Sequence, residues 1–211
     1  MLRASRRPAG IVLLLACAVS AVVAQPKPDA LKAYREGRYE EARTICLAEL
    51  EATPGNIESY VVLAWSLLSL GRYAEAERYA TIAYATVRKD PRIVEALGEA
   101  SYYLGKNAEA LKYFQAYVNL LPDGSRIGSV YYLMGEVYLR LERLGHADIA
   151  LRTALQYEPG NAAWWTRLGY VRERAADWTW SLQAYETALR LDPAQPDARL
   201  GRDRVTDRMR R

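Results

Sequence analysis

The chain has 211 residues and a formal net charge of +4 at neutral pH, and it contains two cysteines and one histidine. The N-terminal 24 residues hold three arginines and no acidic residue, so without them the net charge is +1 and about 187 residues remain. That length fits one elongated array rather than several domains. The one cysteine left, Cys46, excludes an intrachain disulfide and argues against a CxxC or zinc site.

Residues 1–24 are predicted to be a secretory signal. Three arginines precede an apolar run, Ile11 to Val23, which ends in small residues at Ala24. The run is shorter than the ~20 residues that a membrane-spanning helix needs. We therefore expect an exported protein, in the bacterial periplasm, with a short linker at residues 25–28. Two alternatives stay open: an uncleaved N-terminal anchor, and lipid attachment at Cys17, which follows a loose lipoprotein-like sequence.

The remaining chain repeats itself with a fixed period. The stretch Gly71-Arg72-Tyr73-Ala74-Glu75-Ala76 has counterparts that begin at Gly37 and Gly105, 34 residues away on either side. In each copy, a glycine that can adopt a positive φ ends one helix, and a small alanine opens the next. Such a period indicates an array of helix pairs. One three-residue insertion, which we place at Asp123-Gly124-Ser125, predicts a longer loop there.

Further periodic positions carry small residues, large residues and prolines in a set order. The fourth unit has Tyr131-x2-Met134-Gly135-x2-Tyr138, followed by Ala147, Ala154 and Pro159. This pattern resembles the tetratricopeptide repeat (TPR), W-x2-L-G-x2-Y followed by A-x3-F, A and P. The resemblance covers residues 28–195, with departures at Tyr117, Arg88 and Arg172. It implies an all-α, right-handed TPR superhelix, an α-solenoid of antiparallel helix pairs with about 4.5 repeats and a C-terminal capping helix.

The predicted units follow one another without a break. They are a truncated first repeat (29–56), three repeats of which the last carries the insertion (57–90, 91–124 and 125–161), a fifth repeat (162–195) and a basic capping helix (196–211). The arginines of the capping helix are expected to face solvent and to keep the last apolar surface of the array covered. Contact of this helix with anionic lipid stays open as an alternative. For an exported protein, nucleic acid is not an expected partner.

No catalytic, metal or cofactor site is predicted. The single histidine, His146, occupies a helix position where the sister repeats carry glutamates, and that position is normally solvated. No glycine-rich phosphate loop precedes a helix, and no nucleophile elbow occurs. We therefore expect a protein that is not an enzyme.

The TPR resemblance implies that the first helix of each unit lines a concave groove. The residues expected there are aromatic or apolar, with glutamates in the middle and arginines towards the far end: Val61, Trp65, Leu68, Glu95, Glu99, Tyr102, Tyr132, Glu136, Arg140, Tyr170 and Arg174. Apolar anchors of a partner are expected on the aromatic rings, and its basic side chains on the glutamates. The alternative is that several of these rings only join adjacent helices.

The predicted function is a non-enzymatic adaptor of the cell envelope that binds a segment of another envelope protein in this groove. The alternative is an accessory, ligand-binding subunit of an envelope transport system. Trp180 also stands at a normally solvated position, which indicates a second contact or self-association. The other explanation for Trp180 is that its ring stacks on the arginine-rich final helix.

Overall fold

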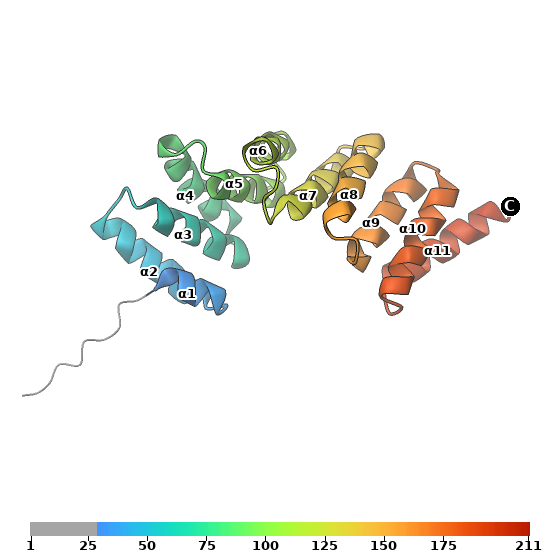
Figure 1. Cartoon of the computed structure of the whole chain (residues 1–211), viewed down its shortest axis with the longest axis horizontal. Helices are drawn as coiled ribbons and strands as arrows, with labels where there is room; N and C mark the ends of the chain where they lie inside the picture. The colour runs from blue at the N-terminus through green and yellow to red at the C-terminus, as the bar shows by residue number, and fades with distance from the viewer. Residues whose placement is uncertain (1–28) are drawn as a thin grey trace, which may run out of the picture.

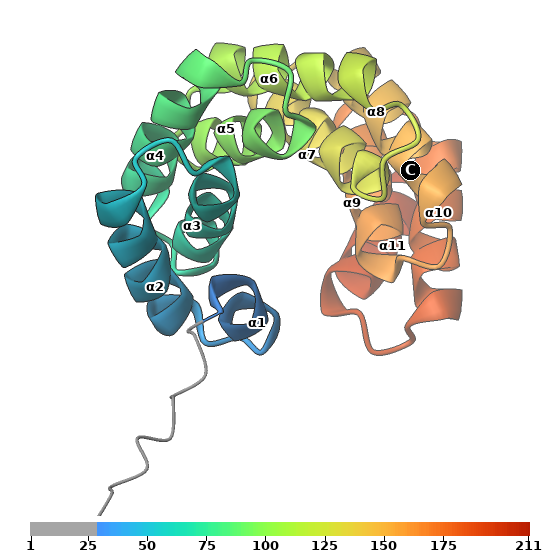
Figure 2. The ribbon, with the colours of Figure 1, turned by 60° about the vertical axis from the view of Figure 1, so that its left-hand side comes forward.

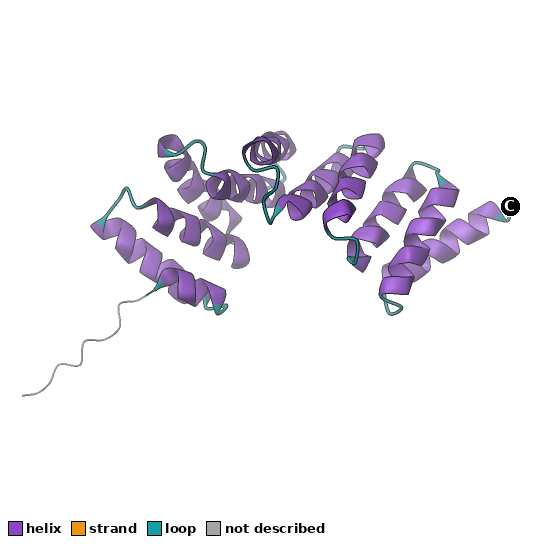
Figure 3. Cartoon of the chain, viewed as in Figure 1, coloured by secondary structure: helices purple, strands orange, loops and turns teal. Residues whose placement is uncertain are grey.

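The computed structural model describes residues 29–211, and within that range all regular structure is helical (Figure 1, Figure 3). The helices are α1 (Ala30–Arg35), α2 (Tyr39–Ala52), α3 (Ile57–Ser69), α4 (Tyr73–Thr86), α5 (Pro91–Tyr103), α6 (Asn107–Leu120), α7 (Ile127–Arg140), α8 (Leu144–Tyr157), α9 (Ala162–Arg174), α10 (Trp178–Leu191) and α11 (Pro196–Met209). The predicted signal, the linker at residues 25–28 and Cys17 lie outside the described residues.

Consecutive helices pack as antiparallel pairs, and successive pairs turn into an open arc (Figure 2). The odd-numbered helices line the inner side of the arc, and the even-numbered helices form its outer layer. The predicted all-α solenoid of helix pairs, closed by one last helix, is therefore confirmed.

The turn within each pair spans three residues and ends the first helix in the same way each time. Gly37, Gly71 and Gly105 have φ values of 76°, 71° and 75°, and Glu142 and Ala176 take the equivalent place in the last two pairs. At the Gly71 turn, Arg72 N donates to Leu67 O at 2.8 Å, so the last carbonyls of α3 are satisfied. The residue with positive φ thus sets the tight reversal that brings the two helices of a pair together.

Side chains of matched size hold the two helices of a pair together. The ring of Phe114 lies so close to Gly98 that a Cβ there would be 2.6 Å from it, and Leu151 approaches Gly135 in the same way, at 2.8 Å. These contacts explain the periodic small residues, because helices approach this closely only where one of them has no side chain. Cys46 is fully buried in the first pair, and burial raises the pKa of its thiol to about 12.

The insertion lengthens the loop between α6 and α7. This loop spans residues 121–126, whereas the link between α2 and α3 spans only residues 53–56. Gly124 is buried against Tyr117, and a Cβ at Gly124 would lie 2.6 Å from the Tyr117 hydroxyl oxygen. The loop consequently folds down onto α6 and brings its end, Arg126, next to α5.

The final helix, α11, closes the array. It buries Ala198, Gly201 and Val205 against Tyr185 of α10, while most of its arginines are exposed. Among residues 29–211, none of the helices combines the length and the apolar character needed to span a bilayer.

Candidate functional site

A hollow of about 650 Å³ opens on the inner side of the arc, and we call it the N-terminal hollow. It lies between α3, α5 and the α6–α7 loop, with α1 at its edge. Its apolar and aromatic walls include Tyr34, Trp65, Leu68, Tyr103, Tyr117 and Leu121. Its charged lining consists of Arg92, Glu95, Glu99 and Arg126.

Two aromatic side chains of this hollow are held in place by other rings. The Trp65 and Tyr34 ring centroids lie 5.7 Å apart, and Trp65 also packs against the core of the first three helix pairs. Tyr103 is 49% exposed and stacks on Tyr73, with centroids 4.3 Å apart. A ring that is fixed on one side and open on the other offers contact area at little cost in conformational entropy.

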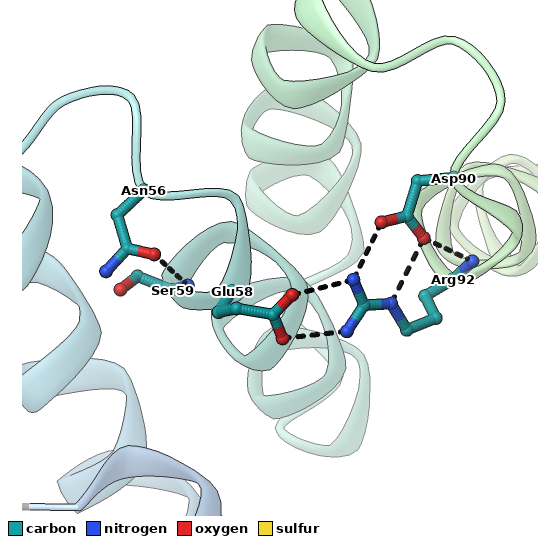
Figure 4. A network of polar contacts seen from close by, with 5 residues as sticks. All are labelled: Asn56, Glu58, Ser59, Asp90 and Arg92. Carbon is teal, nitrogen blue, oxygen red and sulfur yellow. Dashed lines mark hydrogen bonds and ion pairs between the residues drawn. The ribbon is translucent and has the colours of Figure 1, made fainter.

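The charges of the N-terminal hollow form two networks. Arg126 Nε donates to Glu95 Oε1 at 2.6 Å, and its Nη2 donates to Glu99 Oε1 at 2.5 Å. Glu95 is only 6% exposed, so burial raises its pKa, although Arg126 opposes this shift. In the second network, Arg92 bonds to both oxygens of Glu58, at 2.7 and 2.8 Å, and also to Asp90 (Figure 4). Together the networks contain four carboxylates and two guanidinium groups.

A second hollow, of about 420 Å³, lies between α7, α9 and α11, and we call it the C-terminal hollow. Its walls include Tyr132, Thr166, Arg167, Tyr170, Asp197 and Arg204.

Each arginine of the C-terminal hollow has its own glutamate. Arg167 binds both oxygens of Glu136, and Arg204 binds both oxygens of Glu173 at 2.8 Å. The Tyr185 hydroxyl also donates to Glu173, at 2.7 Å. Burial would raise the pKa of Glu173, but the hydrogen bonds from Arg204 and Tyr185 outweigh it and lower the pKa.

The predicted groove residues divide between these places. Trp65, Leu68, Glu95 and Glu99 line the N-terminal hollow, and Tyr132 and Tyr170 line the C-terminal hollow.

The remaining predicted residues lie between the hollows or at the far end of the inner side. The Arg140 guanidinium lies 3.9 Å above the Tyr102 ring, and its Nη1 donates to the Tyr102 carbonyl at 2.8 Å. Arg174 pairs with Glu142 at 2.7 Å.

The structure corrects the expectation for Val61 and shows contacts within this chain for Glu136 and Tyr132. Val61 is 1% exposed, because neighbouring helices of the inner layer cover it, so it belongs to the core. Glu136 is engaged by Arg167 of this chain rather than left for a partner. Tyr132 stacks on Trp164, with centroids 5.1 Å apart and planes 10° apart, and burial raises its pKa to about 12. Tyr132 therefore joins α7 to α9 as well as lining a hollow.

The expected alternative for Trp180, stacking on the final helix, is wrong. Trp180 is 54% exposed, and the guanidinium near its ring belongs to Arg172 of α9, at 5.8 Å. Among the arginines of the final helix, Arg208 places its guanidinium instead 5.7 Å from the centroid of the Trp178 ring. Trp180 lines a hollow of about 830 Å³ on the outer side, bordered by α8, α9 and α10, which the sequence did not indicate.

Arg126, Arg167 and Arg204, which bind glutamates on the inner side, are absent from the residues predicted for the groove. The three pairs nevertheless share one spacing: Glu95–Arg126, Glu136–Arg167 and Glu173–Arg204 are each 31 residues apart. For Glu136–Arg167 and Glu173–Arg204 this spacing is about one helical turn less than the 34-residue period, so a search for opposite charges near the repeat period would have found them. The Glu95–Arg126 pair spans the insertion, so the regular period does not indicate it. Within residues 29–211, no group of three or more His, Cys, Asp and Glu side chains is placed to hold a metal ion.

Comparison with known proteins identifies similar sequences and folds. A family profile described as a tetratricopeptide repeat matches residues 61–125 and 132–196, which together make up more than half of the chain. The tetratricopeptide repeat domain-containing protein PYG7 of Arabidopsis thaliana, a chloroplastic protein, is 25% identical over 165 residues, which cover 72% of this chain and 55% of that protein. The chain thus spans about half the length of this curated relative.

Two solved structures show the same fold. The crystal structure of MamA is 18% identical, with a TM-score of 0.69, and the match covers 78% of this chain and 94% of that one. YrrB, described as a TPR protein with an unusual peptide-binding site, is 17% identical with a TM-score of 0.69, and the match covers 82% of this chain and 88% of that one. Similarity at this level of identity indicates a common fold and nothing more specific.

Proposed function

Since the chain belongs to the tetratricopeptide repeat family, whose right-handed superhelices are scaffolds for protein–protein interaction, we propose that it binds an extended segment of a partner protein on its concave side. In this proposal the chain is an adaptor of the cell envelope without catalytic activity of its own. The partner is another envelope protein.

The observation that carries the proposal is the N-terminal hollow. Its volume of about 650 Å³ falls within the ~300–1,000 Å³ that is usual for binding sites. Its rings are held by neighbouring rings and keep one side open, and aromatic residues of this kind provide most of the binding energy at interfaces. The helices form an open arc, so an extended segment that is bound in the hollow can continue along the inner side (Figure 2). The unusual peptide-binding site described for YrrB is consistent with this use of the fold.

Crosslinking from matched positions tests which side of the arc binds. A photo-crosslinking amino acid replaces Tyr103 on the inner side or Ile149 on the outer side, which are both exposed. The proposal predicts that a crosslinked protein appears from the Tyr103 position and not from the Ile149 position. It would be refuted by crosslinks that arise equally from both positions, or only from Ile149.

Two substitutions give a second, independent test. Trp65→Ala is expected to abolish the Tyr103 crosslink, because an aromatic hot spot contributes ~2 kcal/mol or more. Ile149→Ala, which removes an exposed apolar side chain of the outer side, is the control and should leave the crosslink intact. Circular dichroism establishes that both variants are folded, and Trp65→Phe should restore part of the crosslink. Self-association through Trp180 stays a prediction, for which sedimentation of Trp180→Glu at several concentrations is the measurement.

Location in the envelope is supported by the N-terminal sequence, in which three arginines precede the apolar run Ile11 to Val23. Cell fractionation of the full chain beside a variant without residues 1–24 is the test. The full chain should be found in the envelope and the truncated chain in the cytoplasm. The same distribution for both chains would contradict an export function for these residues.

A further inference from the structure

The ion pairs of the inner side are not equally balanced. Glu136 and Glu173 each have a guanidinium of their own, from Arg167 and Arg204. Glu95 and Glu99, in contrast, share the single guanidinium of Arg126. The other arginine of the N-terminal hollow does not make up the difference, because it is bound by two carboxylates outside this pair.

Each carboxylate of the unequal pair has one oxygen that Arg126 does not bind. Arg126 donates only to the Oε1 atoms of Glu95 and of Glu99, so the Oε2 atom of each carboxylate receives no bond from that guanidinium. Both glutamates line the hollow directly, one helical turn apart on α5. The negative charge of Glu99 also acts on the nearby Tyr103, whose pKa is raised by burial first and by that charge second.

The walls around these carboxylates suit a cationic side chain with a long apolar stem. Trp65, Leu68 and Tyr103 line the same hollow. Aromatic faces attract the positive heads of arginine and lysine, and apolar surface holds their methylene stems. This chain already uses such a contact, since Arg140 lies 3.9 Å above the ring of Tyr102.

We propose that the N-terminal hollow binds an arginine or lysine side chain of the partner segment, which sits between the Glu95–Glu99 pair and the rings of Trp65 and Tyr103. An apolar residue next to the cation packs on Leu68. The occupant is therefore a basic and apolar sequence within a polypeptide. This inference rests on the proposed function and adds the chemistry that selects the partner.

Selection from random peptides tests the inference without knowledge of the partner. The full-length protein is used to select from a phage-displayed library of random linear peptides, in parallel with Glu99→Gln, Trp65→Ala and Glu142→Gln. Glu142→Gln removes the same charge from an exposed position at the far end of the inner side, so it controls for net charge. The affinity of the selected peptides is then measured at low and at physiological salt.

The expected result is a set of peptides with an arginine or lysine beside an apolar residue. Their binding should weaken about fivefold in Glu99→Gln, which is the upper end of the range for loss of a solvent-accessible ion pair, and less than about twofold in Glu142→Gln. Acetyllysine in place of lysine in the peptide should cause a similar loss with the wild-type protein. This last comparison is independent of any effect of Glu99→Gln on folding.

Two other outcomes separate this inference from the proposed function. Peptides that depend on Trp65 but carry no basic residue, or bind Glu99→Gln as they bind wild type, would overturn the inference and leave the proposed function standing. A library that yields no peptide dependent on Trp65 would overturn both.

Discussion

The ring of Tyr185 lies between two glycines, and this arrangement allows a quantitative prediction. A Cβ at Gly201 of α11 would lie 2.2 Å from Tyr185 Cζ, and a Cβ at Gly169 of α9 would lie 2.8 Å from Cδ1. Tyr185 is buried, and its hydroxyl donates to Glu173 at 2.7 Å. The ring therefore has no free direction in which to move away from a new methyl group.

Gly201→Ala is consequently expected to loosen the final helix. Carbon atoms in contact lie ~3.5–4.0 Å apart, so the new methyl group overlaps the ring by more than 1 Å. Overpacking of this kind costs ~1–3 kcal/mol, against a gain of ~1 kcal/mol from the better helix propensity of alanine. The expected net loss is about 1 kcal/mol, and it falls on α11, because the end of a repeat array contacts only one neighbouring unit.

Hydrogen–deuterium exchange measures this loss where it occurs. A loss of about 1.4 kcal/mol corresponds to about tenfold faster exchange, so amides of α11 should exchange about five to ten times faster in Gly201→Ala. Gly145→Ala is the control, because a Cβ at Gly145 meets nothing within 4 Å, and this change should leave exchange the same or slower. If α11 stayed as protected in Gly201→Ala as in wild type, the explanation of this glycine by close packing would be refuted.

Three further predictions concern buried groups. Arg126→Ala leaves the buried Glu95 without its cation, so it should lower the free energy of unfolding by about 2 kcal/mol in urea titrations, and Arg126→Lys should recover part of that loss. The pKa of Glu173 is lowered in the folded state, so its pairing with Arg204 stabilises the fold above the unfolded pKa of ~4.3, and the contribution is lost as pH falls through the folded pKa. Glu173→Gln should therefore be less stable than wild type at pH 7, and the difference in melting temperature should vanish in acid; a constant difference would contradict this reasoning. Burial raises the pKa of Cys46 to about 12, so at pH 8 a thiol reagent should react only after urea is added, and rapid labelling of the native protein would show that the first helix pair opens.

Repetition made the fold predictable from the sequence. The glycines of the first three turns are 34 residues apart, and the small residue under each large one recurs with the same period except across the insertion. Each such residue acts on its own turn or on the adjacent helix. The all-α solenoid of antiparallel helix pairs could therefore be predicted from the sequence. The insertion was likewise visible as a break in the period, and the structure places the longer loop at residues 121–126.

The lining of the inner side was predictable only in part. The periodic pattern places Trp65 and Glu99 on the inner side, and both line the N-terminal hollow. The pattern does not determine how deeply a residue lies in that layer, which is why Val61 was expected in the groove although it is buried. The TPR pattern describes one unit at a time, so it does not predict the contacts between units.

The sequence by itself thus determined the helices, the turns, the number of units and the side of each helix that packs within its pair. These features depend on local conformation and on neighbours within one repeat period. Only the tertiary structure decided which arginine neutralises which glutamate, because that depends on how each unit is rotated against the next. The same rotation leaves Glu95 and Glu99 to share the single guanidinium of Arg126, while Glu173 has Arg204 to itself.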